Sequence, residues 1–171
     1  MKILISTAGI GSRLGNLTKY LNKSLVRVGK KASISYIIES YPKDSEFVIC
    51  LGYHGDLVSQ YIKLAHPEIN VTYVEVDKYD GEGSSLLYSI SCAKKHLQHP
   101  FIFHACDTIL DKDLKISLDN NWIIGFKKTD SSQYRSLNVV NGKVIKFFDK
   151  GEINSDYDYV GVCGIKNYEL F

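Results

Sequence analysis

The chain has few of the features that mark secreted, membrane-embedded or metal-cluster proteins. It contains no Cys-x-x-Cys pair, and its four cysteines are far apart at Cys50, Cys92, Cys106 and Cys163. This usage indicates buried thiols in a reducing compartment. No apolar run approaches the ~20 residues of a membrane span. Met1-Lys2 leads directly into an apolar segment, without the pattern of a signal peptide. These absences predict a cytoplasmic protein with no membrane partner.

An excess of charge of one sign is also missing. Lysine and arginine number 21 and aspartate and glutamate 19, for a formal net charge of +2, and like charges form no run. A nucleic-acid-binding surface is therefore not indicated, and small charged ligands fit better. The chain has only three prolines and shows no repeat, low-complexity tract or linker. With 171 residues, 44% of them hydrophobic, it predicts one domain over residues 1–171.

Short apolar runs alternate with amphipathic segments along the chain. Strands are predicted over residues 2–8, 46–51, 69–76, 100–106 and 121–127, and helices over residues 33–41, 55–65 and 84–97. This order predicts an α/β fold, a Rossmann-like and mostly parallel sheet with helices on both faces. Asn141-Gly142 separates two further apolar segments and predicts a two-residue hairpin. The α/β core should therefore have an antiparallel hairpin appendage.

A glycine-rich segment follows the first strand. The residues Gly9-Ile10-Gly11-Ser12-Arg13-Leu14-Gly15 come directly after Ala8, and Lys23 follows eight residues later. Glycines leave no Cβ in the way, so consecutive backbone N–H groups can converge on phosphate oxygens. Arg13 and Lys23 would supply positive charge. The segment therefore predicts a triphosphate-binding loop.

Other glycine loops fit this spacing less well. The third glycine of a dinucleotide-binding fingerprint would fall on Leu14. A Walker A loop fails because Gly15 is followed by Asn16. A simple strand-to-helix turn would account for Gly9 and Gly11, but it leaves the two cations unexplained.

Two further segments lie where ligands bind in an open α/β sheet, outside the carboxyl ends of the strands. Asp107 follows the strand predicted over residues 100–106 and is a candidate Mg²⁺ ligand, since this ion prefers one or two carboxylates with phosphate oxygens and waters. Its alternative role is to cap the local turn. Gly83 and Ser84 open the third predicted helix and offer N–H donors to a ribose, a base or an anion, and Ser84 or Ser85 can cap that helix.

Taken together, these motifs resemble the sugar-phosphate nucleotidyltransferases and their phosphocholine cytidylyltransferase relatives. The most specific match comprises Ala8-Gly9-Ile10-Gly11-Ser12-Arg13-Leu14 and Lys23-Ser24-Leu25-Val26. Weaker matches are Gly83-Ser84-Ser85, Asp107, Phe148-Asp149-Lys150 and the segment 159–165. The resemblance covers nearly the whole chain.

The resemblance implies a role for each matched residue. Ala8, Gly9, Gly11 and Ser12 would hold the nucleotide, with Gly83 and Ser84 at its base or ribose. Arg13 would bind the β and γ phosphates, Lys23 the α-phosphate, and Asp107 Mg²⁺. Asp149 and Lys150 would bind a phosphate monoester, whose oxygen attacks the α-phosphate in line and expels pyrophosphate. Such a reaction needs positioning and charge neutralisation but no covalent enzyme intermediate.

Several alternatives stay open at this stage. The family usually has a second metal carboxylate well after the strand near residue 160, and the sequence offers no candidate. Residues 1–171 would therefore be a truncated domain, the N-terminal part of a larger protein, or a member that has lost its second half. A non-catalytic nucleotide or sugar-nucleotide sensor, or a molybdenum-cofactor type nucleotidyltransferase, would share the first loop. The short spacer between Lys78-Tyr79 and the next helix favours CTP and a small phospho-alcohol slightly. A homo-oligomer is compatible with the family.

Overall fold

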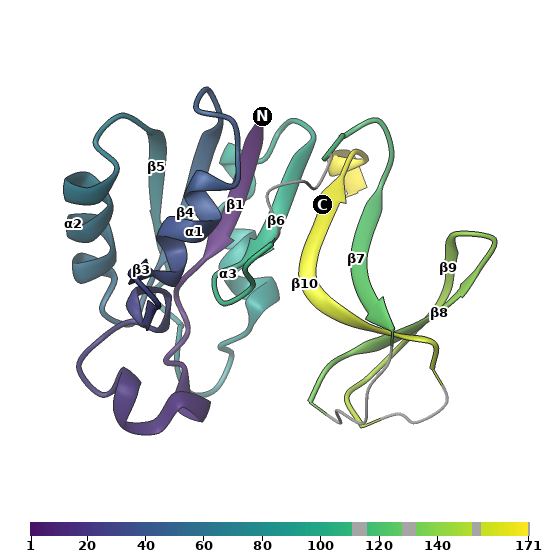
Figure 1. The fold of residues 1–171 in the computed structure, drawn as a ribbon, viewed down its shortest axis with the longest axis horizontal. Coiled ribbons are helices and arrows are strands. Elements are labelled where there is room, and N and C mark those ends of the chain that lie inside the picture. Colours follow the sequence, from purple (N-terminus) through teal and green to yellow (C-terminus); the bar gives the residue numbers. More distant parts are fainter. Residues whose placement is uncertain (111–115, 128–132, 152–154, 171) are drawn as a thin grey trace.

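A mixed β-sheet organises the molecule (Figure 1). The computed structural model describes residues 1–110, 116–127, 133–151 and 155–170. Within these residues the sheet has eight strands, in the order β5-β4-β1-β6-β10-β8-β9, with β7 also paired to β10. The parallel half consists of β1 (Lys2–Ser6), β4 (Glu46–Leu51), β5 (Asn70–Glu75) and β6 (Phe101–Ala105). The predicted α/β, Rossmann-like class is confirmed.

The antiparallel half is larger than the predicted hairpin. It consists of β7 (Trp122–Lys127), β8 (Ser136–Val140), β9 (Lys143–Phe148) and β10 (Tyr157–Ile165). The hairpin itself is present, and Asn141 and Gly142 have the positive φ values, 50° and 73°, that its two-residue turn requires. The segment predicted as 121–127 forms a strand, but it pairs antiparallel to β10. Periodicity predicts a strand without giving its direction, which depends on where the chain returns to the sheet.

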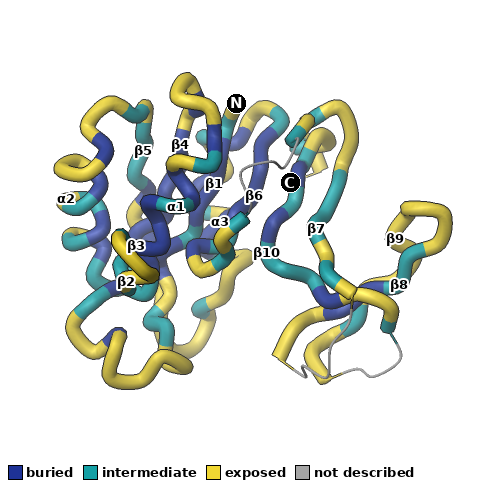
Figure 2. Tube along the Cα trace, in the orientation of Figure 1, coloured by how far each residue is buried: buried dark blue, intermediate teal, exposed yellow. Residues whose placement is uncertain are grey.

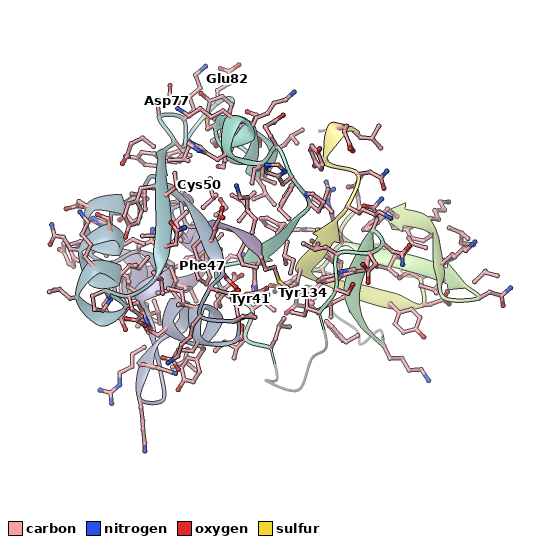
Figure 3. The ribbon with its side chains drawn as sticks, turned by 90° about the horizontal axis from the view of Figure 1, so that it is seen from above. Tyr41, Phe47, Cys50, Asp77, Glu82 and Tyr134 are labelled. Atoms are coloured by element: carbon pink, nitrogen blue, oxygen red, sulfur yellow. The ribbon has the colours of Figure 1, made fainter. Side chains whose placement is uncertain are left out.

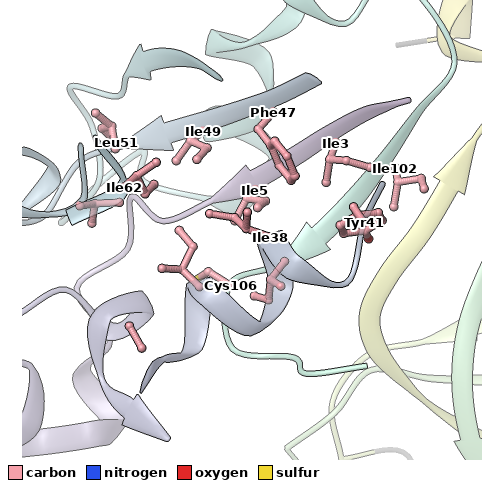
Figure 4. Close-up of a cluster of buried hydrophobic side chains, with 14 of the residues drawn as sticks. Ile3, Ile5, Ile38, Tyr41, Phe47, Ile49, Leu51, Ile62, Ile102 and Cys106 are labelled. Carbon is pink, nitrogen blue, oxygen red and sulfur yellow. The ribbon is translucent and has the colours of Figure 1, made fainter. Parts of the chain in front are cut away.

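Helices cover both faces of the parallel half, as predicted. Helices α1 (Ser33–Glu39) and α2 (Gly55–Ala65) pack on the face that carries Ile3 and Ile5, and α3 (Leu86–Cys92) packs on the face that carries Leu4. Because successive side chains of a strand point to opposite faces, one apolar strand supplies both cores. Figure 4 shows the first of these cores between α1 and the sheet. Figure 2 shows that most residues of β1, β4 and β6 are buried, whereas β5 at the edge of the sheet is mostly intermediate or exposed.

The remaining described elements are short. The third helix was predicted to residue 97, but α3 ends at Cys92 and a 3₁₀ turn, Lys94–His96, follows it. Other 3₁₀ segments are Ser12–Thr18, Lys23–Leu25 and Tyr168–Leu170, and β2 (Arg27–Val28) pairs with β3 (Lys31–Ala32). No helix in the described part of the chain is both long and apolar enough to cross a membrane.

Candidate active site

A cavity of about 410 Å³ opens at the carboxyl ends of β1 and β6. Its walls come from four separate parts of the chain: the segment after β1, the loop before α3 with α3 itself, the end of β6, and the middle of β10. The lining residues are Ser6, Gly9, Ile10, Lys23, Tyr79, Asp80, Ser84, Ser85, Leu86, Ser89, Phe103, Ala105, Cys106, Tyr159 and Gly161. The fold therefore brings the first glycine segment, Lys23 and the second glycine loop to one place.

Asn22 fixes the segment between the first glycine loop and Lys23. This side chain is fully buried, and its amide nitrogen donates to the carbonyl oxygens of Thr7 at 2.7 Å and Tyr53 at 2.6 Å. Its Oδ1 accepts hydrogen bonds from the backbone N–H of Ser24 at 2.9 Å and from the Ser24 hydroxyl at 2.8 Å. Asn22 thus caps the 3₁₀ turn that begins at Lys23 and ties that turn to the ends of β1 and β4. The position of Lys23 is therefore fixed by buried contacts.

Lys23 and Asp107 form an ion pair at the edge of the cavity. Lys23 Nζ lies 3.1 Å from Asp107 Oδ2, and the two side chains are 22% and 50% exposed. Burial alone would lower the pKa of the Lys23 ammonium, but its interactions with Cys106 and Asp107 together outweigh burial and leave that pKa above its ordinary value. Burial raises the pKa of the Cys106 thiol to about 11, so this thiol is neutral near pH 7 and Asp107 is the negative partner of Lys23. The lysine therefore stays charged.

Ser33 and Gly11 make further contacts with the residues around this ion pair. The buried Ser33 hydroxyl lies 2.9 Å from the carbonyl oxygen of Ser24 and 3.2 Å from that of Cys106. It therefore bridges the turn that carries Lys23 and the turn that carries Asp107. Gly11 has a left-handed φ of 67°, and a Cβ there would lie 3.0 Å from the Cβ of Lys23. Gly11 thus packs against the lysine stem, so its role in this structure includes packing as well as backbone freedom.

The second glycine loop has the geometry of a helix start. Gly81 and Gly83 both have positive φ values, 71° and 81°. Ser85 is the N-cap of α3, and its side chain accepts a hydrogen bond from the N–H of Tyr88 at 3.0 Å. Both serines line the cavity, and the Ser84 hydroxyl donates to the Gly81 carbonyl at 2.7 Å. The capping role that the sequence left open for this serine pair therefore falls on Ser85.

Not every predicted site residue lines the cavity. Ala8 is buried in the core, and its carbonyl accepts a hydrogen bond from the N–H of Tyr53 at 2.9 Å. Ser12 and Arg13 are exposed in the 3₁₀ segment that follows Gly11, and neither is part of the lining. Gly83 is also exposed and lies outside the lining. Gly11 and Asp107 are not lining residues either, and each adjoins the lining through its contact with Lys23.

The predicted acceptor residues lie on the antiparallel half. Asp149 and Lys150 are exposed just after β9, and neither lines the described cavity. Asp149 forms an ion pair with Arg135, with Nη2 and Oδ1 3.3 Å apart. Figure 3 labels Tyr134, the residue before Arg135, apart from Asp77 and Glu82, which are labelled close together.

Sequence reasoning missed several cavity residues. Tyr79 and Asp80 lie before the second glycine loop, and the Asp80 carboxylate accepts a hydrogen bond from the N–H of Gly81 at 2.8 Å. The Asp-Gly pair was a local signal that could have identified this turn. Asn22 had no signal, because only the folded chain shows which carbonyl oxygens it satisfies.

A second cavity, of about 870 Å³, lies against the antiparallel half. It is lined largely by apolar and aromatic side chains of β7 to β10, including Trp122, Leu137, Phe147 and Tyr157. Tyr159 lines both cavities and packs edge-to-face against Phe147, with ring centroids 6.2 Å apart. The two cavities therefore meet at β10.

Two curated proteins show the family. The chain is 25% identical over 179 residues to glucose-1-phosphate cytidylyltransferase of Salmonella typhi, a match that covers 88% of this chain and 69% of the relative. It is 32% identical over 116 residues to choline-phosphate cytidylyltransferase of Streptococcus pneumoniae, covering 67% of this chain and 48% of the relative. The chain belongs to the sugar-phosphate nucleotidyltransferase family. These homologues are nucleotidyltransferases of the pyrophosphorylase type.

Solved structures support the same fold. A UDP-glucose pyrophosphorylase complexed with UDP-glucose matches with a TM-score of 0.79 at 16% identity, over 99% of this chain and 78% of that chain. A CTP:phosphocholine cytidylyltransferase from Streptococcus pneumoniae matches with a TM-score of 0.73 at 22% identity, over 99% and 73%. At these identities the likeness concerns the fold alone. No protein-family model matches the sequence.

Proposed function

We propose that this member of the family is a Mg²⁺-dependent nucleotidyltransferase. It would transfer a nucleoside monophosphate from a nucleoside triphosphate, with CTP favoured, to the phosphate of a sugar phosphate or a small phospho-alcohol, and release pyrophosphate. Residues 1–171 would form a nucleotidyltransferase-like domain. The relatives named above include one cytidylyltransferase for a sugar phosphate and one for choline phosphate, which supports both the base and the two acceptor classes.

One observation carries the proposal: a charged lysine, a half-exposed carboxylate and an unobstructed glycine meet at the cavity. Lys23 and Gly9 line it, and Asp107 pairs with Lys23 at 3.1 Å. Gly9 has nothing within 4 Å of the place where a Cβ would stand. A phosphate can therefore approach the backbone at Gly9 while remaining close to the Lys23 ammonium.

The chain's own residues would act by positioning and by neutralising charge. Lys23 would neutralise the negative charge that develops on the α-phosphate as the acceptor oxygen attacks. At ~4 Å and an effective dielectric of about 20, such a contact amounts to a few kcal/mol. The backbone at Gly9 would orient the triphosphate, and Ser84 would contact the base or ribose from the opposite wall. Arg13 would complete the triphosphate site from its exposed 3₁₀ segment.

The donor set fits Mg²⁺. The Asp107 carboxylate is half exposed and pairs with Lys23, which lines the cavity. Mg²⁺ suits such a site because it takes one or two carboxylates and completes its shell with phosphate oxygens and waters. Asp107 would hold the ion, which when bound would neutralise charge on the phosphates.

The acceptor would bind from the β10 side of the cavity. Tyr159 and Gly161 line that side. Asp149 and Lys150, which lie outside the lining, remain the residues proposed for the acceptor, with Lys150 at its phosphate. Replacing Lys150 by alanine tests this part alone. We expect the Michaelis constant of the acceptor to rise while that of the nucleotide stays constant.

Thermal unfolding with nucleotides is the first test. The full chain is heated with CTP, UTP, GTP, ATP or dTTP, each with Mg²⁺ and with EDTA. A ligand at ~100 times its Kd stabilises the folded state by about 2.7 kcal/mol, a rise in midpoint of roughly 5–10 °C for a chain of this size. We expect such a shift with one nucleotide, dependent on Mg²⁺.

Pyrophosphate release then separates the enzyme from a nucleotide sensor. The nucleotide that binds is incubated with glucose 1-phosphate or with phosphocholine, and pyrophosphate is measured. Release with one acceptor supports the transferase. A Mg²⁺-dependent thermal shift without release from either acceptor favours a non-catalytic nucleotide or sugar-nucleotide sensor.

A further inference from the structure

His104 is a fully buried histidine that uses both ring nitrogens. It lies on β6, and its Nε2 is 2.8 Å from the carbonyl oxygen of Thr108. A carbonyl can only accept, so Nε2 carries the hydrogen. Nδ1 of the neutral ring then accepts from the hydroxyl of Tyr41 at 2.7 Å. Burial lowers the pKa of His104, in agreement with a neutral ring.

The hydrogen bond from His104 holds the turn that carries Asp107. Within this turn the N–H of Thr108 donates to the carbonyl of Ala105 at 3.2 Å. The Thr108 hydroxyl donates to the carbonyl of Val160 on β10 at 2.6 Å. The turn is therefore attached on one side to His104 and Tyr41 and on the other side to β10.

The packing around this turn leaves little room for it to shift. Gly161 has a left-handed φ of 84°, and a Cβ there would lie only 2.7 Å from the Cβ of Ala105. Tyr41 is buried just after α1 and packs edge-to-face against the His104 ring, with centroids 5.6 Å apart. Figure 4 shows Tyr41 beside Ile102, in the core between α1 and the sheet. Tyr41, itself packed in the core, therefore fixes the position of the His104 ring.

We propose that His104 is a positioning residue that, with Tyr41, directs the Asp107 carboxylate toward Lys23 and the metal–nucleotide complex. His104 acts at a distance, because it does not line the described cavity. The side chain of Asp107 pairs with Lys23 at 3.1 Å only while the turn keeps its direction. The inference rests on the proposed function of Asp107 as a metal ligand. It adds a buried hydrogen-bond chain from Tyr41 to the metal site.

Two polar substitutions of His104 make a matched test. In H104Q the side-chain amide can reach the place of Nε2 and donate to the Thr108 carbonyl. In H104N the shorter amide reaches only the place of Nδ1, so that carbonyl loses its donor. Both variants keep a buried amide, and only H104N leaves the Thr108 carbonyl without its donor. A role in stability alone would change the unfolding midpoint without changing the response to Mg²⁺. The variant Tyr41→Phe removes one hydroxyl and leaves the aromatic packing in place.

The first readout is the Mg²⁺ concentration that gives half of the nucleotide-induced thermal shift. Losing a group that orients a metal ligand typically weakens metal binding 10–100-fold, and His104 would orient Asp107 through the backbone of Thr108. We expect H104N to raise this concentration about tenfold or more, H104Q to stay within about threefold of the wild type, and Y41F to fall between them. Equal Mg²⁺ responses of H104N and H104Q would overturn the inference.

The second readout does not require a nucleotide. Amide hydrogen exchange at Thr108, followed by NMR, reports the turn directly, and we expect faster exchange in H104N than in H104Q. Equal exchange in the two variants contradicts the inference. If the wild-type protein shows no Mg²⁺-dependent shift with any nucleotide, the proposed function fails, and the exchange data still decide whether His104 holds the turn.

Discussion

The ammonium of Lys23 and the carboxylate of Asp107 lie 3.1 Å apart although they are separated by 84 residues in the sequence. The ion pair joins the turn after the first glycine loop to the turn after β6. Because the carboxylate is half exposed, water screens the pair, and such pairs contribute only about 0–1 kcal/mol to folding. The contact therefore arranges the site more than it stabilises the fold.

Replacing Lys23 by alanine should separate catalysis from stability. We expect turnover to fall by about 10²–10³, the loss seen when one donor to a transition-state charge is removed. The free energy of unfolding should change by no more than about 1 kcal/mol. Steady-state pyrophosphate release and thermal unfolding measure the two quantities. Lys19→Ala is the control, since Lys19 is exposed and outside the cavity. Similar turnover in both variants would remove Lys23 from the proposed mechanism.

Replacing either of two glycines beside the cavity by alanine should change a different property: stability for Gly52 and nucleotide binding for Gly9. A Cβ on Gly52 would lie 2.7 Å from the carbonyl oxygen of Ala8 and 2.8 Å from the Cβ of Tyr79. We expect Gly52→Ala to lose about 1–3 kcal/mol of stability, as overpacked sites do.

The site around Gly9 is open, with nothing within 4 Å of the place where a methyl group would stand. We expect Gly9→Ala to keep the stability of the wild type and to weaken nucleotide binding by about tenfold or more, or ~1.4 kcal/mol, because the methyl group occupies the path of the phosphate. Urea unfolding and calorimetric titration with nucleotide measure the two effects. Unchanged affinity in Gly9→Ala would mean that the loop is only a turn.

Asn22 should be important for stability. In Asn22→Ala the carbonyls of Thr7 and Tyr53 lose their donor, and each buried unsatisfied group costs roughly 1–3 kcal/mol. We expect a loss of about 2–4 kcal/mol in urea unfolding. Asn16→Ala removes an exposed asparagine and serves as the control. A loss in Asn22→Ala no larger than in this control would show that the fold does not depend on the amide.

The stability of the protein should decrease in mild acid. Burial lowers the pKa of His66, whose Nε2 lies 2.8 Å from the Ser35 hydroxyl, and also lowers that of His104. The unfolded chain therefore binds more protons than the folded state just below the ordinary histidine pKa of about 6.5. The stability that the two neutral histidines contribute is complete above this pH. It is lost as the pH falls toward the lower pKa values that they have in the folded state.

Urea unfolding at pH 7.5, 6.5 and 5.5 measures this dependence. We expect the midpoint to fall with pH, and His66→Gln to reduce the fall because one of the two groups no longer titrates. A midpoint that stays constant or rises on acidification would show that the buried histidines do not control stability in this range.

Local patterns predicted most elements because each element depends on nearby residues. The segments 46–51 and 55–65 were predicted with the bounds that β4 and α2 have in the structure. Alternating apolar residues and helical spacing determine such elements almost independently of the rest of the chain. Asn141-Gly142 likewise determined its hairpin, since both residues accept the positive φ that the turn needs.

The sequence by itself determined the α/β class, the glycine loop and the candidate residues Lys23 and Asp107, because residue type and spacing encode these features locally. Only the tertiary structure decided which candidates meet. It paired Lys23 with Asp107, left Arg13, Asp149 and Lys150 outside the described cavity, and gave β7 its antiparallel direction. It also placed Asn22 against the carbonyl groups of Thr7 and Tyr53, and His104 against the hydroxyl of Tyr41. These contacts join residues that are far apart in the sequence. They could not be predicted from the sequence because they depend on burial and close packing in the folded chain and not on the spacing of residues.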